Sequence, residues 1–179
     1  RALPRLLLIA AVGLLVARFG FALWEQGHPP HLSDRVPWLE PAAAIAAARD
    51  HHRPILYDFS AEWCGPCKLL EREVFSDRAS AAEIATMYTP AKVLDRRQEE
   101  GVNSAIVDSL QRHFRIEGFP TLLAVTDDGV ELGRLVGFHG RAATVDSLRA
   151  FSSRGMMRRM AKLRLPFAPV APAPTGGTP

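Results

Sequence analysis

The sequence predicts an α/β fold, in which helices cover both faces of a mixed central sheet, preceded by an N-terminal transmembrane helix. Three observations support this prediction. Predicted helices and strands alternate through two crossover units and end in a hairpin and a helix. The apolar and charged fractions, 47% and 23%, are typical of a chain that builds a packed core. A long apolar segment precedes this region. At 179 residues the chain suits one domain with extensions, and we assign the domain to residues 41–155.

The apolar segment covers residues 6–24 and contains a single charge, Arg18. Its nineteen residues would form a helix of about 28 Å, close to the thickness of the hydrocarbon core. Two arginines precede it, so the positive-inside rule places the domain outside the cytoplasm. The alternative is a cleaved signal peptide with small residues at Gly20 and Ala22. We therefore expect residues 1–25 to anchor or export the domain, as a single-pass protein of the inner (cytoplasmic) membrane facing the periplasm.

The first half of the predicted domain follows a linker. Residues 26–40 contain glycine and prolines without periodicity, which predicts a linker. Pro41 suits the first turn of an Ala-rich helix, and Asp58 is the one carboxylate in an otherwise apolar strand. The predicted elements are a helix at 41–49, a strand at 55–60, a helix from Cys64, and a helix to Met87 capped at Ser76 and Asp77.

The second half contains a strand, an amphipathic helix, a hairpin and a last helix. Asn103 is suited to cap the amphipathic helix, and Gly155 is suited to end the last one. The Asp127-Asp128-Gly129 run is a strong hairpin signal. The predicted elements are strands at 91–94, 121–126 and 131–136 and helices at 103–114 and 144–153.

The C-terminal region, residues 156–179, is expected to lie outside the domain. Arginines and lysines follow Arg149 as far as Arg164 without an acidic residue, and methionines and leucines are interleaved with them. Such a segment could lie on anionic lipid or dock a partner, or it could be a solvated extension of the last helix. Residues 166–179 are rich in Pro and Ala and are expected to be disordered.

The chain contains only two cysteines, Cys64 and Cys67. Two cysteines are too few for a disulfide-stapled framework, and a zinc site would need further ligands. Attachment of haem requires a histidine where Lys68 follows the pair. A redox-active dithiol therefore remains the principal interpretation, with two buried structural thiols as the alternative.

The spacing of the pair suits thiol–disulfide exchange. Cys64 directly precedes a predicted helix, where free N–H groups and the helix dipole favour a thiolate. We expect its pKa to fall below about 8.5, to near 7. Cys67 lies one turn later on the same face and can resolve a mixed disulfide. Gly65 permits a partner backbone to approach, and Pro66 fits the first helical turn.

Two segments resemble thioredoxin. Residues 58–68 are similar to its active-site segment, and residues 118–121 are similar to the loop whose cis proline faces the disulfide. Gly137 matches a family glycine after the last strand, and the resemblance covers about residues 54–153. The chain is thus identified as a member of the thioredoxin superfamily. Residues 73–77 and 96–108 are most similar to the C-terminal domain of DsbD-type transmembrane thiol reductases, and to related exported thioredoxin-like proteins.

The resemblance implies a thioredoxin-like fold and a redox-active disulfide between Cys64 and Cys67. It also implies that Asp58 is buried, with a raised pKa, and accepts the proton of Cys67. The alternative for Asp58 is a structural carboxylate held by backbone hydrogen bonds. Because the segment before Pro120 is longer than in thioredoxin, the resemblance does not assign Lys92 as the lysine that partners this carboxylate.

The resemblance further implies a substrate platform around Pro120. A cis peptide bond before Pro120 would present neighbouring backbone groups to an extended substrate. Phe119 and Thr121 flank this proline and are expected to support the substrate. Trp63 would pack beside the thiols and shape access to them, or serve as a structural aromatic residue.

These observations predict a thiol–disulfide oxidoreductase of the protein-disulfide reductase type. We expect it to reduce disulfides of exported proteins with electrons from a transmembrane thiol reductase, and to be held on the membrane by its N-terminal helix. No cofactor, metal or nucleic-acid partner is expected. The alternatives are a disulfide oxidase or isomerase, and an accessory docking subunit of a membrane complex.

Overall fold

The computed structural model describes residues 12–20 and 34–163, in two separate units. Residues 12–20 are helical and belong to the N-terminal unit. Within the described ranges, no helix is both long enough and apolar enough to cross a membrane. Most of the predicted anchor at 6–24, and the tail from residue 164 onward, lie outside these ranges.

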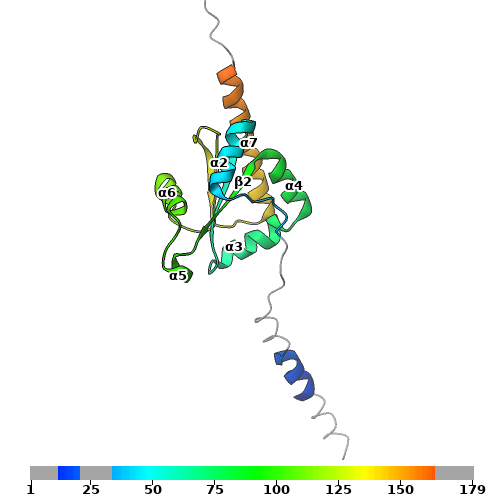
Figure 1. Cartoon of the computed structure of the whole chain (residues 1–179). Coiled ribbons are helices and arrows are strands. Elements are labelled where there is room, and N and C mark those ends of the chain that lie inside the picture. Colours follow the sequence, from blue (N-terminus) through cyan, green and yellow to red (C-terminus); the bar gives the residue numbers. More distant parts are fainter. Residues whose placement is uncertain (1–11, 21–33, 164–179) are drawn as a thin grey trace, which may run out of the picture. The chain divides into compact units, whose positions relative to one another are not determined.

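The second unit contains the predicted α/β domain (Figure 1). Its elements are α2 (Pro41–His51), β1 (Ile55–Ala61), α3 (Gly65–Leu70), the π-helical segment η1 (Glu71–Phe75), α4 (Arg78–Met87), β2 (Thr89–Asp95), α5 (Arg97–Glu100), α6 (Ala105–Phe114), β3 (Thr121–Val125), β4 (Glu131–Val136) and α7 (Arg141–Leu163). Pro41 begins α2, and the Asp77 carboxylate caps α4 by accepting the Ser80 N–H, as the sequence predicts.

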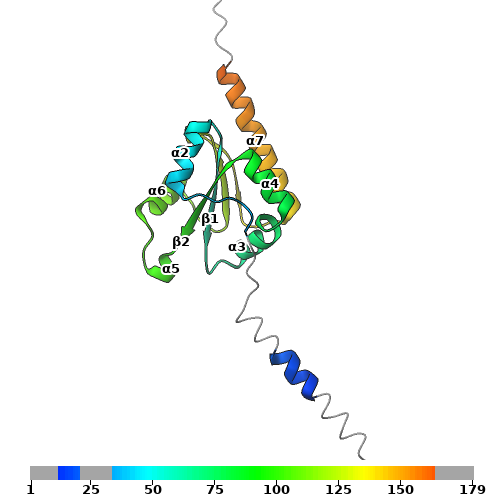
Figure 2. The same cartoon turned by 45° about the vertical axis from the view of Figure 1, so that its right-hand side comes forward.

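The sheet has the order β2-β1-β3-β4 and is mixed, as predicted. Strand β1 is parallel to β2 and antiparallel to β3, and β3 is antiparallel to β4. The parallel pair requires a crossover, which α3, η1 and α4 supply. Gly129, at φ 86°, supplies the left-handed residue in the turn between β3 and β4. Helices α2 and α6 cover one face of the sheet, and α3, α4 and α7 cover the other (Figures 1 and 2).

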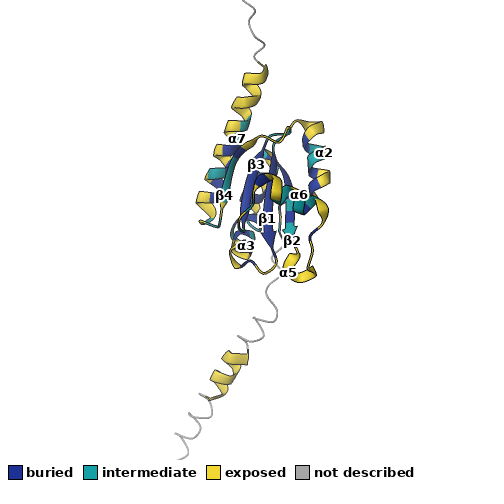
Figure 3. Cartoon of the chain, turned by 90° about the vertical axis from the view of Figure 1, so that its left-hand side faces the viewer, coloured by how far each residue is buried: buried dark blue, intermediate teal, exposed yellow. Residues whose placement is uncertain are grey.

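Strand β1 runs through the centre of the core and is buried along its whole length (Figure 3). Successive side chains of a strand point to opposite faces. Tyr57 and Phe59 accordingly pack in the cluster on the α2–α6 face, whereas Leu56 packs in the cluster formed with α3, η1, α4 and α7. Asp58 has the parity of Leu56, so its carboxylate is directed to the face that carries the cysteine helix.

The predicted linker at 26–40 differs from the structure in its last part, because residues 34–40 pack on the domain. The Arg35 N–H donates to Phe75 O at 2.9 Å, and the Leu39 N–H donates to Pro90 O at 3.0 Å. The Trp38 ring lies edge-on against Phe75, with centroids 4.9 Å apart. Prolines suggested a solvated linker, but these apolar side chains and backbone hydrogen bonds bring the segment into the domain, which begins at Asp34.

The loop after β2 also differs from the prediction. It contains the short helix α5, and Asn103 does not cap α6, whose N-cap residue is Ser104. Asn103 is buried; its amide donates to Asp95 Oδ2 at 2.8 Å, and its carbonyl oxygen accepts the Arg96 N–H at 2.7 Å. The buried Asp95 carboxylate needs hydrogen-bond donors. The Asn103 side chain supplies one of them instead of capping α6.

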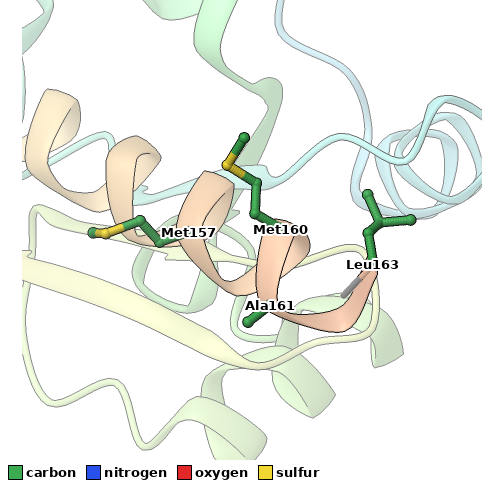
Figure 4. Close-up of a pocket in the computed structure, with 4 residues that line it drawn as sticks. All are labelled: Met157, Met160, Ala161 and Leu163. Atoms are coloured by element: carbon green, nitrogen blue, oxygen red, sulfur yellow. The ribbon is translucent and has the colours of Figure 1, made fainter. Parts of the chain in front are cut away.

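Helix α7 extends beyond its predicted end and runs to Leu163. Gly155 does not terminate it: a Cβ there would lie 2.9 Å from Leu132 Cδ1, so the glycine allows the helix to pack closely on β4. The predicted domain boundary at residue 155 therefore falls inside a helix. In its last turns Met157, Met160 and Leu163 are exposed and, with Ala161, line a pocket at the end of the domain opposite α3 (Figures 1 and 4).

Replacing Gly133 by alanine is expected to destabilise the domain. A Cβ at this position would lie 2.4 Å from Cδ1 and Cε1 of the buried Phe151 ring, so the ring must move. Overpacking of this kind lowers the free energy of unfolding by about 1–3 kcal/mol, which urea denaturation measures. Gly118→Ala is the matched control, because nothing lies within 4 Å of its Cβ. Equal stability of the two variants would contradict the close packing of α7 on β4.

Candidate active site

The two cysteines lie at the junction of β1 and α3. Cys64 occupies the N-cap position of α3, and the Cys67 N–H donates to Cys64 Sγ at 3.2 Å. The two sulfurs form a disulfide of 2.07 Å, and both residues are buried. Neither cysteine is a free thiol in this structure. The N-cap geometry puts Cys64 Sγ against the backbone N–H of Cys67, which can stabilise a thiolate after reduction.

The residues between the cysteines keep this helix end accessible. Pro66 lies in the first turn of α3, where its missing N–H leaves no hydrogen bond unmade. A side chain at Gly65 would meet nothing within 4 Å, so the space in front of it is open. The backbone of a partner can therefore come close to the disulfide, as the sequence predicts.

The loop before β3 packs against the disulfide. The Phe119–Pro120 peptide bond is cis, as the resemblance implies. Phe119 packs against the cluster formed by Ala61 and the two cysteines, and its ring centroid lies 6.0 Å from that of Trp63. The Thr121 hydroxyl donates to Gly118 O at 2.7 Å and stabilises the loop. The structure thus brings Phe119 against the disulfide, with Pro120 and Thr121 next to it in the chain, while their contacts with substrate stay a prediction.

Trp63, directly before Cys64, is exposed, with 51% of its surface accessible. Because about half of the Trp63 side chain is in solvent, this residue does not belong to the core. A purely structural role for Trp63 is therefore not favoured. Its edge-on contact with Phe119 extends an apolar surface beside the thiols. This surface suits contact with an apolar segment of a substrate.

Asp58 is buried with 2% of its surface exposed. Its Oδ2 lies 3.5 Å from Lys92 Nζ, whereas its Oδ1 has no hydrogen-bond partner among the described residues. Burial raises the pKa of Asp58 to about 6, and the charge of Lys92 partly opposes this rise. The backbone hydrogen bonds of the structural alternative are not seen within residues 34–163. A carboxylate of this pKa is mostly ionised at pH 7 and can accept a proton.

Lys92 is the cation beside this carboxylate, an assignment that the sequence left open. Residues 58 and 92 are directly paired across the parallel strands β1 and β2. The ammonium group also lies 3.5 Å from Asp34 Oδ2 and 5.4 Å from the Trp38 ring centroid. Sequence reasoning missed Asp34, because it lies in a segment whose prolines indicated a linker. A lysine in an otherwise apolar strand was the available signal for a buried ion pair.

Comparisons with known proteins agree with this geometry. A family model described as a thioredoxin-like domain matches residues 41–152. The thiol:disulfide interchange protein DsbD of Actinobacillus pleuropneumoniae is 29% identical over 126 residues, which are 65% of this chain and 20% of that protein. A thioredoxin of Mycobacterium bovis is 35% identical over 98 residues, 54% of this chain and 72% of that protein.

A solved structure of a thioredoxin from Thermus thermophilus superposes with a TM-score of 0.59 at 25% sequence identity. The match covers 73% of this chain and 98% of that one. By contrast, the present chain spans only about a fifth of the length of the Actinobacillus DsbD protein that it matches.

Proposed function

The chain belongs to the thioredoxin-like domain family and is a thioredoxin-like thiol–disulfide oxidoreductase, and on that premise we propose that it reduces disulfides in exported proteins. The observation that carries the proposal is the arrangement of the Cys64–Cys67 pair at the N-terminus of α3, on the face to which the Asp58 carboxylate is directed. The Gly65-Pro66 dipeptide resembles that of reducing thioredoxins and supports this direction of electron flow.

The reaction transfers two electrons from the reduced pair to a substrate disulfide. The Cys64 thiolate attacks one substrate sulfur, forms a mixed disulfide and releases the other substrate sulfur as a thiolate. Cys67 then gives its proton to Asp58 and attacks Cys64 Sγ. This step breaks the mixed disulfide, re-forms the Cys64–Cys67 bond and releases the second substrate thiolate. Asp58 passes its proton to solvent, and a second dithiol must re-reduce the domain.

We also propose that the domain acts on the periplasmic side of the inner membrane. The apolar sequence at 6–24 supports attachment by the N-terminal segment, and similarity to DsbD proteins supports a transmembrane thiol reductase as electron donor. An oxidising compartment requires such a donor because it supplies no soluble reductant. Alkaline extraction of membranes from expressing cells tests attachment: full release of the protein would contradict it.

The reduction potential of the Cys64–Cys67 pair tests the direction. Equilibration with glutathione or with a reference thioredoxin should give a value of about −270 mV, as for reducing thioredoxins. A value of about −120 mV would instead identify a disulfide oxidase.

Trapping tests the substrate class. In Cys67→Ser the attacking Cys64 remains, but the mixed disulfide cannot be resolved, so exported proteins should accumulate as adducts in periplasmic extracts. Nonreducing electrophoresis followed by mass spectrometry identifies them. The matched control is Cys64→Ser with Cys67→Ser, which should trap nothing. If both variants gave the same pattern, the proposed attack by Cys64 would be wrong.

A further inference from the structure

Lys92 lies between two carboxylates that come from different parts of the domain. Its Nζ is 3.5 Å from Asp58 Oδ2 in β1 and 3.5 Å from Asp34 Oδ2 in the segment before α2. Only 3% of the Asp58 side chain and 18% of the Asp34 side chain are exposed. One ammonium group is therefore shared by two largely buried carboxylates.

Asp34 is held in this place by its own contacts. Its Oδ1 accepts the Val36 N–H at 3.0 Å, and its Oδ2 accepts the Trp38 indole N–H at 2.5 Å. The Trp38 ring packs against Phe75, and the same two rings lie beside the Lys92 ammonium, with centroids at 5.4 and 5.7 Å. These contacts fix the ammonium between the carboxylates, and the rings exclude water from one side of it.

We propose that Asp34 is a positioning residue for the dithiol reaction: by sharing Lys92 with Asp58, it keeps the Asp58 carboxylate able to take up and release the Cys67 proton near neutral pH. This inference deepens the proposed function and rests on it for the role of the proton. Without Asp34, Lys92 would pair with Asp58 alone and hold it ionised. A carboxylate held in this way is a weaker base toward the Cys67 thiol.

The charged groups that act on Asp58 come from β2, from the segment before α2 and from η1. Lys92 of β2 favours the ionised carboxylate, whereas the negative charges of Asp34 and of Glu71 in η1 disfavour it. When the disulfide is reduced, the thiols of Cys64 and of Cys67 in α3 become titratable as well. Asp34 differs from Glu71 in that it also contacts the Lys92 ammonium directly. It acts both through its own charge and through the position of the lysine.

The test is an NMR titration of the Asp58 carboxyl carbon in the oxidised protein. In Asp34→Asn we expect the midpoint to fall by about half a pKa unit or more, because one negative charge is lost and Lys92 is released toward Asp58. Asp50→Asn, which removes the same charge from the exposed end of α2, should leave the midpoint unchanged. Asp34→Glu retains the charge and should restore most of the wild-type value.

A double-mutant cycle separates the lysine-mediated effect from the direct one. In a Lys92→Met background the shift caused by Asp34→Asn should shrink, since the shared cation is gone. An undiminished shift would overturn the role of Lys92. If Asp34→Asn fails to fold, Asp34→Ser removes the same charge while keeping an acceptor for the Val36 N–H, and the same fall is expected.

An unchanged Asp58 midpoint in a folded charge-removing variant would overturn the proposal. The titration uses the oxidised protein without substrate, so its outcome is independent of whether the domain reduces exported proteins. With reduced protein and a model disulfide, the acidic limb of the rate profile should move to lower pH in Asp34→Asn. That limb would stay in place if Asp34 were only structural.

Discussion

Cys64→Ser is expected to abolish disulfide reduction, with a loss of more than about a thousandfold in an insulin-reduction assay. The nucleophile must be ionised, and the N-cap position of α3 is where the backbone N–H of Cys67 reaches a sulfur. Serine is similar in size, and its hydroxyl oxygen can accept the Cys67 N–H in place of Cys64 Sγ, so α3 should retain its start. The variant thus removes the chemistry while leaving the local structure in place.

Comparison with Cys67→Ser gives the sharper result. Both variants stop turnover, but only Cys67→Ser should form a stable mixed disulfide with a model substrate. Reduced wild-type protein is the stability reference, because neither variant can form the internal disulfide. If Cys64→Ser formed the adduct and Cys67→Ser did not, the roles assigned to the two sulfurs would have to be exchanged.

Local patterns were sufficient to predict the sheet and the cysteine site. Strand β1 is a largely apolar run interrupted by Asp58 and Ser60, and the Asp127-Asp128-Gly129 turn fixes the β3–β4 hairpin. The Cys64–Cys67 spacing carries its own chemistry, because both sulfurs belong to one helical turn. Signals of this kind lie within a few residues of one another, and for this reason a single sequence displays them.

The errors concern contacts between distant segments. Asp34 and Lys92 are 58 residues apart, and no local pattern indicates that they meet. Prolines near Asp34 indicated a linker, but Trp38 packing on Phe75 outweighs that signal. Gly155 was interpreted as a helix end because glycine often follows helices, whereas here it allows α7 to approach Leu132. Tertiary packing decided each of these positions.

Asp58→Asn is expected to raise stability at pH 7 while slowing the reaction. In the folded protein burial raises the pKa of Asp58 to about 6, about two units above its ordinary value of 3.8. The folded state therefore binds this proton more tightly, so stability falls as pH rises from about 4 to about 6. The difference between the folded and unfolded pKa values of Asp58 corresponds to about 3 kcal/mol of lost stability at pH 7. This is an upper limit for the stability that Asp58→Asn can regain, because the asparagine amide also needs hydrogen-bond partners.

Urea denaturation at two pH values measures this effect. Asp58→Asn should exceed the wild-type free energy of unfolding at pH 7 and lose that advantage near pH 4, where the native carboxyl is already protonated in the folded state. Asp50→Asn serves as control, since its carboxylate is exposed and should change stability little at either pH. If Asp58→Asn were more stable than the wild type by the same amount at both pH values, the loss of a buried ionisable group would not be the cause of the higher stability.

The same substitution should slow resolution of the mixed disulfide by about a hundredfold, because the base that accepts the Cys67 proton is lost. In the wild type the rate of this step should fall as pH falls through about 6, the pKa of Asp58. In Asp58→Asn this pH dependence of the rate should be absent. Stopped-flow mixing of a preformed adduct measures both. Together these results would show a buried carboxylate that lowers the free energy of unfolding at neutral pH but speeds proton transfer there, so that its benefit is to the reaction and not to stability. A variant that gained stability without losing rate would show that Asp58 is not the base.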